Sequence, residues 1–225
     1  MKISNSNCRW TASLGVAVLL WSASLAEAQE VLRYEAKAIG SKVKVEGTST
    51  IHDWTVESRI VGGFMEIDTK FMTDPAFKPA AGLKLTPKVE VNIPVRSVKS
   101  DKPRMDEVMH EAMKEPANKN IQYRLKEMTL TEVPANPDGL FKFDTTGDLT
   151  VSGVTKSIQM PVTLHKAGAD AVKVMGEIKL KMTDFGIKPP APSIALGLIK
   201  TGDDVKVSFE WLTAKKKAAS AQKTP

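Results

Sequence analysis

The sequence predicts an all-β protein, with an antiparallel sheet that forms a barrel or a sandwich and with one short helix. Apolar and polar residues alternate in segment after segment, as they do in strands with one buried face. Clusters of Gly, Asn, Pro and Asp separate the segments and indicate tight turns. Periodicity does not distinguish a barrel from a sandwich.

The alternating segments extend through most of the chain, and no linker or repeat interrupts residues 31–213, so we expect one domain. The clearest pair flanks a turn at Ser152-Gly153 and predicts an antiparallel hairpin. The period-two apolar residues are Val43 and Val45; Val89, Val91 and Ile93; Phe141 and Phe143; Leu149 and Val151; Ile158, Met160, Val162 and Leu164; Val172 and Val174; Ile178, Leu180 and Met182; and Val205, Val207, Phe209 and Trp211.

One segment has the period of an amphipathic helix. Its apolar stripe is preceded by Pro103 and stopped by Pro116, and consists of Met105, Val108, Met109, Ala112 and Met113. Methionine adapts to irregular surroundings. The stripe therefore either fills the gap between helix and sheet or forms the lid or wall of a cavity.

The chain begins like an exported protein. Residues 1–28 contain basic residues, an apolar stretch and the small-residue sequence Ala26-Glu27-Ala28, which predicts a signal peptide cleaved near Ala28. A transmembrane anchor is the alternative, but the apolar stretch is shorter than the roughly 20 residues that a bilayer requires. Cys8 would leave with the signal, so we expect a periplasmic or secreted protein without disulfides. Residues 215–225 predict a disordered basic tail, either solvated or in peripheral contact with a membrane surface.

Several function classes find no support in the sequence. The formal net charge of +6 is modest and aromatic residues are scarce, so no nucleic-acid partner is expected. The histidines His52, His110 and His165 have no metal-ligand spacing. Neighbouring side chains on a strand point to opposite faces, so His52 and Asp53 are poorly placed for a catalytic dyad. We therefore expect no metal, no cofactor and no enzymatic activity.

Five motifs together resemble one family. The sequence GDLTVSGVTKSIQMPV at 147–162 is similar to the signature of the YceI-like family of lipid-binding, lipocalin-like β-barrels. The segments 47–54, 104–113, 184–187 and 202–205 resemble its other motifs in the same order. The resemblance implies an eight-stranded antiparallel lipocalin-like barrel over residues 29–214, with a polyisoprenoid or another long-chain lipid inside. Such a barrel holds a ligand only where its inward side chains leave room.

We therefore expect an exported carrier that holds a lipid without transforming it. The alternative is a structural or stress-related envelope protein with a filled barrel, and the oligomeric state, including a homodimer, stays open. The expected ligand-binding residues are Trp54, Phe64, Val91, Met105, Met109, Met113, Phe143, Leu149, Phe185 and Ile187. The headgroup candidates are His52, Arg96, Lys99 and Arg104. The alternative for His52 is a structural histidine. The three basic residues form a cluster with Lys102, for which the alternative is a solvated edge, and an ion pair with Asp106 is a third interpretation for Arg104.

Overall fold

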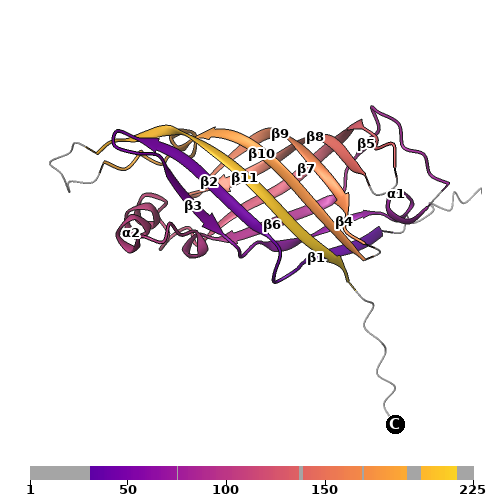
Figure 1. Ribbon diagram of the computed structural model, residues 1–225, viewed down its shortest axis with the longest axis horizontal. Coiled ribbons are helices and arrows are strands. Elements are labelled where there is room, and N and C mark those ends of the chain that lie inside the picture. The colour runs from indigo at the N-terminus through magenta and orange to yellow at the C-terminus, as the bar shows by residue number, and fades with distance from the viewer. Residues whose placement is uncertain (1–30, 75, 137–138, 169, 192–198, 217–225) are drawn as a thin grey trace, which may run out of the picture.

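The computed structural model describes residues 31–74, 76–136, 139–168, 170–191 and 199–216. Figure 1 shows an elongated barrel with a helix at each end. The strands are β1 (Val31–Ala36), β2 (Lys42–Ser49), β3 (Trp54–Ser58), β4 (Gly62–Asp68), β5 (Lys84–Leu85), β6 (Lys88–Pro94), β7 (Asn120–Glu132), β8 (Leu140–Val151), β9 (Val154–Lys166), β10 (Ala171–Lys181) and β11 (Thr201–Lys215). The helices are α1 (Thr69–Thr73) and α2 (Pro103–Ala112), with 3₁₀ turns η1 (Val95–Ser97) and η2 (Met182–Phe185). None of the helices in these ranges is long and apolar enough to cross a membrane.

Eight strands form a closed antiparallel ring in the order β1-β4-β6-β7-β8-β9-β10-β11, which confirms the expected barrel. The pairs Tyr34–Lys215 and Ala36–Thr213 close the ring between β1 and β11. Strands β2 and β3 extend the wall from the other half of β11. Backbone bonds of 2.8 and 2.9 Å between Glu57 and Lys99 tie β3 to the segment after η1.

The predicted hairpin joins β8 and β9 through a two-residue turn. Ser152 and Gly153 both have positive φ values, of 52° and 81°, as a type I′ turn requires. The register then pairs Val151 with Val154 and continues to Leu140 and His165. This long ladder sets the alternation that turns the apolar side chains of both strands inward.

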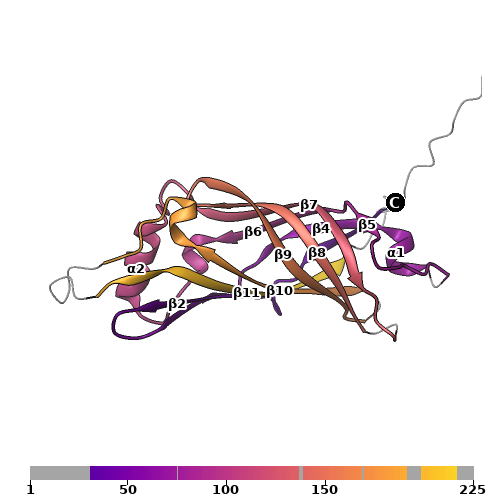
Figure 2. The same ribbon diagram turned by 90° about the horizontal axis from the view of Figure 1, so that it is seen from above.

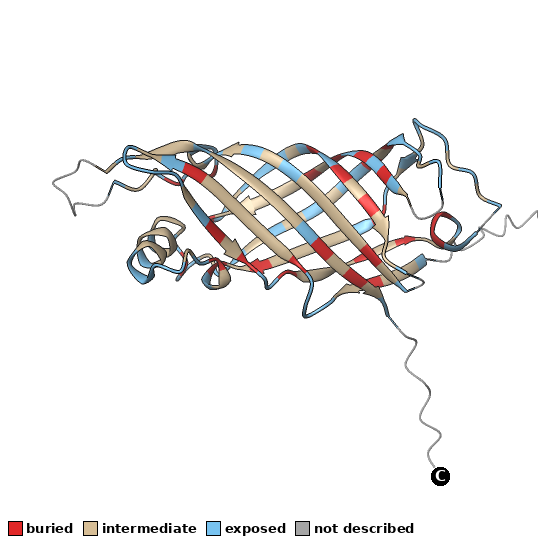
Figure 3. Ribbon diagram, viewed as in Figure 1, coloured by how far each residue is buried: buried red, intermediate tan, exposed pale blue. Residues whose placement is uncertain are grey.

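The two ends of the barrel differ in packing. At the α1 end, the Phe71 ring lies edge-on to Phe141, with centroids 5.4 Å apart, and 6.0 Å from Phe143. Leu130 and Val172, deeper in this cluster, are fully buried. Figure 3 shows buried residues concentrated in the half of the barrel nearer α1, whereas the wall toward α2 is mostly of intermediate burial. The fold therefore combines a packed end with a loosely filled one.

Helix α2 includes four of the five residues of the predicted stripe, with Met113 directly after its last residue, whereas α1 was not predicted. Asp68 caps α1 by accepting a bond of 2.7 Å from the Lys70 amide. Strand β11 includes Lys215, and the Lys216 amide donates to the Arg33 carbonyl at 2.8 Å. The rest of the predicted tail, residues 217–225, lies outside the described residues. The predicted signal peptide lies outside the described residues.

Candidate functional site

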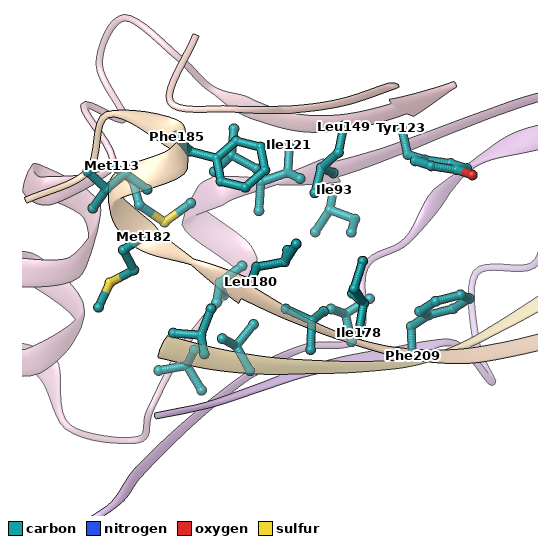
Figure 4. Close-up of a pocket in the computed structure, with 18 of the residues that line it drawn as sticks. Ile93, Met113, Ile121, Tyr123, Leu149, Ile178, Leu180, Met182, Phe185 and Phe209 are labelled. Atoms are coloured by element: carbon teal, nitrogen blue, oxygen red, sulfur yellow. The ribbon is translucent and has the colours of Figure 1, made fainter. Parts of the chain in front are cut away.

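An apolar cavity of about 500 Å³ occupies the barrel interior. Its wall comes from inward residues of nearly every strand, several of which are drawn in Figure 4. Many of these side chains point inward and are still partly exposed, because they face empty space rather than one another. They include Val45, Val91, Ile121, Leu125, Leu149, Ile158, Ile178, Leu180, Val205 and Val207. The barrel is therefore hollow over this part of its length, and the volume lies within the range of small-molecule sites.

The cavity closes toward α1. Met65, Phe143, Leu164 and Trp211 line it there, and each is at most 3% exposed. Behind them lies the aromatic cluster of Phe71. These side chains form a floor, so a long ligand would have one way in.

The cavity reaches solvent at the α2 end. Ile51, at 62% exposed, lines the cavity there. The exposed side chains of His52, Lys102, Arg104 and Lys181 also line this part. The mouth is thus a rim that combines apolar surface with cationic groups, and this combination suits an amphipathic ligand.

Helix α2 forms one wall of the mouth. All five residues of its predicted stripe line the cavity, and none of its residues is fully buried. From η2 and the segment after it, Met182, Phe185 and Ile187 also line the cavity, and Figure 4 shows Phe185 near Met113.

Polar contacts attach α2 to the barrel. The His110 Nε2 atom lies 2.9 Å from the Val98 carbonyl oxygen. In the first turn of α2, Asp106 accepts a bond of 2.7 Å from the amide of Ser100, which precedes the helix, and one of 2.6 Å from the Ser100 hydroxyl. After the helix, Arg96 donates to Glu115 at 2.7 Å. The hydrogen bond and charge of Arg96 hold the pKa of the Glu115 carboxyl below its usual value.

Nine of the ten expected ligand-binding residues line the cavity, and Phe64 does not. The nine are Trp54, Val91, Met105, Met109, Met113, Phe143, Leu149, Phe185 and Ile187. On β4 the residues Met65 and Ile67 are buried inside, so the alternation turns Phe64 outward. There the Arg33 guanidinium lies 3.7 Å from the ring centroid. The expectation for Phe64 is therefore wrong.

Two of the four headgroup candidates line the cavity and two do not. His52 and Arg104 line the mouth, whereas Arg96 and Lys99 are absent from the cavity wall. Arg96 lies elsewhere because it pairs with Glu115. The proposed ion pair of Arg104 with Asp106 is also wrong, because Arg104 donates to Glu107 at 2.8 Å.

Sequence reasoning missed Lys181 at the mouth and Tyr123 on the inner wall. Tyr123 alternates with polar residues in the same phase as Ile121 and Leu125, so its inward position could have been predicted from the sequence. Burial raises the pKa of the Tyr123 phenol above its usual value.

The described residues offer little for catalysis. They contain no group of three His, Cys, Asp or Glu residues that could hold a metal ion. The exposed His52 ring has its Nδ1 atom 2.9 Å from the Asp53 carbonyl oxygen, and its partner is thus backbone rather than carboxylate. Thr145, buried in the wall, donates to the Met160 carbonyl at 2.8 Å. The arrangement is that of a binding cavity.

Residues 30–212 match the YceI-like domain, and this range covers most of the chain. The chain belongs to the YceI-like family. A UPF0312 protein of Pseudomonas fluorescens Pf-5 is 27% identical over 202 residues, which are 80% of this chain and 96% of that protein. A UPF0312 protein of Pseudomonas putida F1 is 30% identical over 182 residues, which are 76% of this chain and 89% of the relative.

Two solved structures share the YceI-like fold. A polyisoprenoid binding domain from Saccharophagus degradans superposes with a TM-score of 0.63 at 15% identity, over 82% of this chain and 99% of that one. BcnA of Burkholderia cenocepacia gives a TM-score of 0.57 at 17% identity, over 79% and 98% of the two chains. At such low identities these likenesses establish the barrel architecture alone.

Proposed function

We propose that this YceI-like protein is an exported carrier that holds a polyisoprenoid or another long-chain lipid in its barrel without transforming it. The observation that carries the proposal is the hollow apolar interior, closed at the α1 end and open at the α2 end. The polyisoprenoid-binding domain from Saccharophagus degradans, which has the same fold, supports the choice of ligand class. The empty interior disfavours the alternative of a structural or stress-related envelope protein with a filled barrel.

Burial of a hydrocarbon chain supplies the affinity. Each methylene transferred from water contributes about 0.8 kcal/mol, so roughly ten of them yield about 8 kcal/mol. Micromolar binding corresponds to about 8 kcal/mol after association costs of at least about 4 kcal/mol are met, so a chain with roughly fifteen buried carbons is needed. The apolar wall has few groups that could pair with a polar ligand atom, so the chain belongs inside and the headgroup outside.

The headgroup then lies at the mouth. Lys102, Arg104 and Lys181 place cationic groups there, and His52 adds a ring that can donate or accept a hydrogen bond. A phosphate or carboxylate headgroup would match these cations. The exposed Ile51 provides apolar contact for the first carbons below it.

Native mass spectrometry of the protein, produced with residues 1–28 in a bacterial host, tests the proposal directly. A stoichiometric adduct that yields a long-chain lipid on organic extraction is expected, and its headgroup charge tests the cationic mouth. The mass of the purified chain also reports whether cleavage near Ala28 occurred, and cell fractionation reports its compartment. A ligand-free mass together with no uptake of added isoprenoids would refute the carrier and favour the filled-barrel alternative.

Substitution of Met109 provides a second test. Met109→Glu places an ionised carboxylate on the cavity wall, and its desolvation by a hydrocarbon chain is unfavourable. We expect lipid uptake to be lost while the β-sheet circular dichroism stays unchanged. Met109→Leu conserves volume and polarity, so it serves as the matched control and retains uptake. Normal uptake by Met109→Glu would show that α2 does not line the binding site.

A further inference from the structure

Three aromatic rings of the cavity lie against glycines of the neighbouring strand. Trp54 lies on Gly47, Tyr123 lies on Gly147 and Phe209 lies on Gly176. A Cβ atom added at Gly147 would come within 2.6 Å of Tyr123 Cε2 and closer still to the phenol oxygen. One added at Gly176 would lie 2.7 Å from Phe209 Cε1 and Cζ. Each ring therefore occupies the space that a side chain would take.

The backbone does not itself require glycine at any of these three positions, Gly47 included. Gly147 and Gly176 lack the positive φ values found at Gly63 and Gly153. In ordinary strand backbone, alanine is usually the more stable residue because glycine loses more conformational entropy on folding. The feature that glycine provides at Gly147 and Gly176 is thus the close approach of a ring.

Tyr123 and Phe209 come from opposite walls of the barrel. Strands β7 and β11 stand four places apart in the ring of eight, which is half the circumference. Figure 4 shows the two rings on the two sides of the cavity, at the same end of the view. Trp211, two residues beyond Phe209 on the same face of β11, belongs to the floor. The pair therefore flanks the passage between the mouth and the floor.

We propose that Gly147 and Gly176 set the width of this passage and thereby admit methyl-branched chains. A ring that lies flat on a glycine leaves the passage wide. With a Cβ atom beneath it, the ring has to turn into the lumen, which is the space left open to it. An isoprenoid carries a methyl branch on every unit and needs this width, whereas a straight acyl chain of equal length passes through a narrower opening.

The inference rests on the proposed function, because it assumes that a chain enters the barrel. Its test is a comparison of two probes with the same main-chain length, geranylgeraniol and hexadecanol, by displacement of a fluorescent fatty-acid analogue. If the unaltered protein binds neither alcohol, the proposed function fails. If it binds hexadecanol but not geranylgeraniol, the inference fails while the proposed function stands. If it binds geranylgeraniol, the variants decide the role of the glycines.

Gly147→Ala should weaken geranylgeraniol binding at least about tenfold and hexadecanol binding less than about threefold, since a factor of ten corresponds to loss of one or two buried methyl contacts. Gly62→Ala is the matched control, because an added Cβ there meets one atom, Asn92 O, at 3.4 Å. The double variant Gly147→Ala with Tyr123→Leu removes the displaced ring and should restore geranylgeraniol binding. The inference would be overturned if Gly147→Ala weakened the binding of both alcohols equally, or if it weakened the binding of neither.

A variant that leaves both glycines unchanged covers the case in which Gly147→Ala does not fold. Phe209→Trp enlarges the ring on the opposite wall and narrows the passage from that side. We expect the same selective loss of the branched alcohol, measured on protein with unchanged circular dichroism. An unaltered ratio of the two affinities would refute control of the width by these rings.

Discussion

The contrast between the packed and hollow ends predicts different responses to the same substitution. Leu130 is fully buried beside the aromatic cluster, whereas Leu180 lines the cavity and is partly exposed to it. Truncation of either leucine to alanine removes the same three carbon atoms. The two variants therefore differ in their surroundings rather than in their chemistry.

The expected magnitudes follow from burial. Leu130→Ala loses about 2.4 kcal/mol of transfer free energy, at about 0.8 kcal/mol per carbon, and creates a new cavity that adds about 1 to 2 kcal/mol. Leu180→Ala loses less than the full transfer term and enlarges a cavity that already exists. We expect the free energy of unfolding to fall by about 4 kcal/mol for Leu130→Ala and by at most about 2 kcal/mol for Leu180→Ala.

Urea unfolding followed by circular dichroism measures both values, on protein stripped of lipid and on protein reloaded with it. A lipid bound as proposed would fill the space beside Leu180, so reloading should increase the effect of Leu180→Ala. The effect of Leu130→Ala should stay the same. Equal losses for the two stripped variants would mean that the barrel wall collapses onto itself in solution, and the argument from a preformed cavity would then fail.

Two further predictions concern an ion pair and a turn. Arg96 lowers the pKa of Glu115, so the pair stabilises the fold above the unfolded pKa of about 4.3 and loses this effect as pH falls through the folded value. The urea midpoint of Glu115→Gln should accordingly be below that of the unaltered protein at pH 7 and approach it near pH 3, and a gap independent of pH would contradict the assignment. Gly153→Ala should lower the free energy of unfolding by about 1 to 2 kcal/mol, because φ is +81° there, and an effect no larger than that of Gly62→Ala would argue against the type I′ turn.

The strands of the barrel were predictable because most of them have one clear apolar face. Phe64 was misplaced because Met65 follows it, and two adjacent apolar residues leave the phase of the alternation open. Pairing with β1 and β6 settles the phase by placing Met65 inside. Helix α1 was missed because five residues are too few to show a 3.6-residue period.

The cavity itself lay beyond sequence reasoning. The composition indicates medium-sized inward residues, but an empty volume depends on how far apart opposite walls stand. Which charged residues face the mouth of the cavity was also beyond sequence reasoning. Arg96 and Arg104 both lie near the predicted start of the helix, yet only Arg104 faces the cavity, because Glu115 from beyond the helix binds Arg96. Such a partner becomes visible only when segments distant in sequence meet.

The pairing of β1 with β11 has a practical consequence for handling the molecule. Val31 pairs with Asp68 beside α1, and the Lys215 amide donates to the Asp170 carbonyl. The start of β1 and the end of β11 therefore both lie near α1, away from the mouth (Figures 1 and 2). A tag, a surface tether or a fused domain attached through either of these strand ends would leave the α2 end facing the surrounding solution. Immobilised protein could therefore take up and release lipid repeatedly on a sensor chip, and ligand exchange could be followed on one sample.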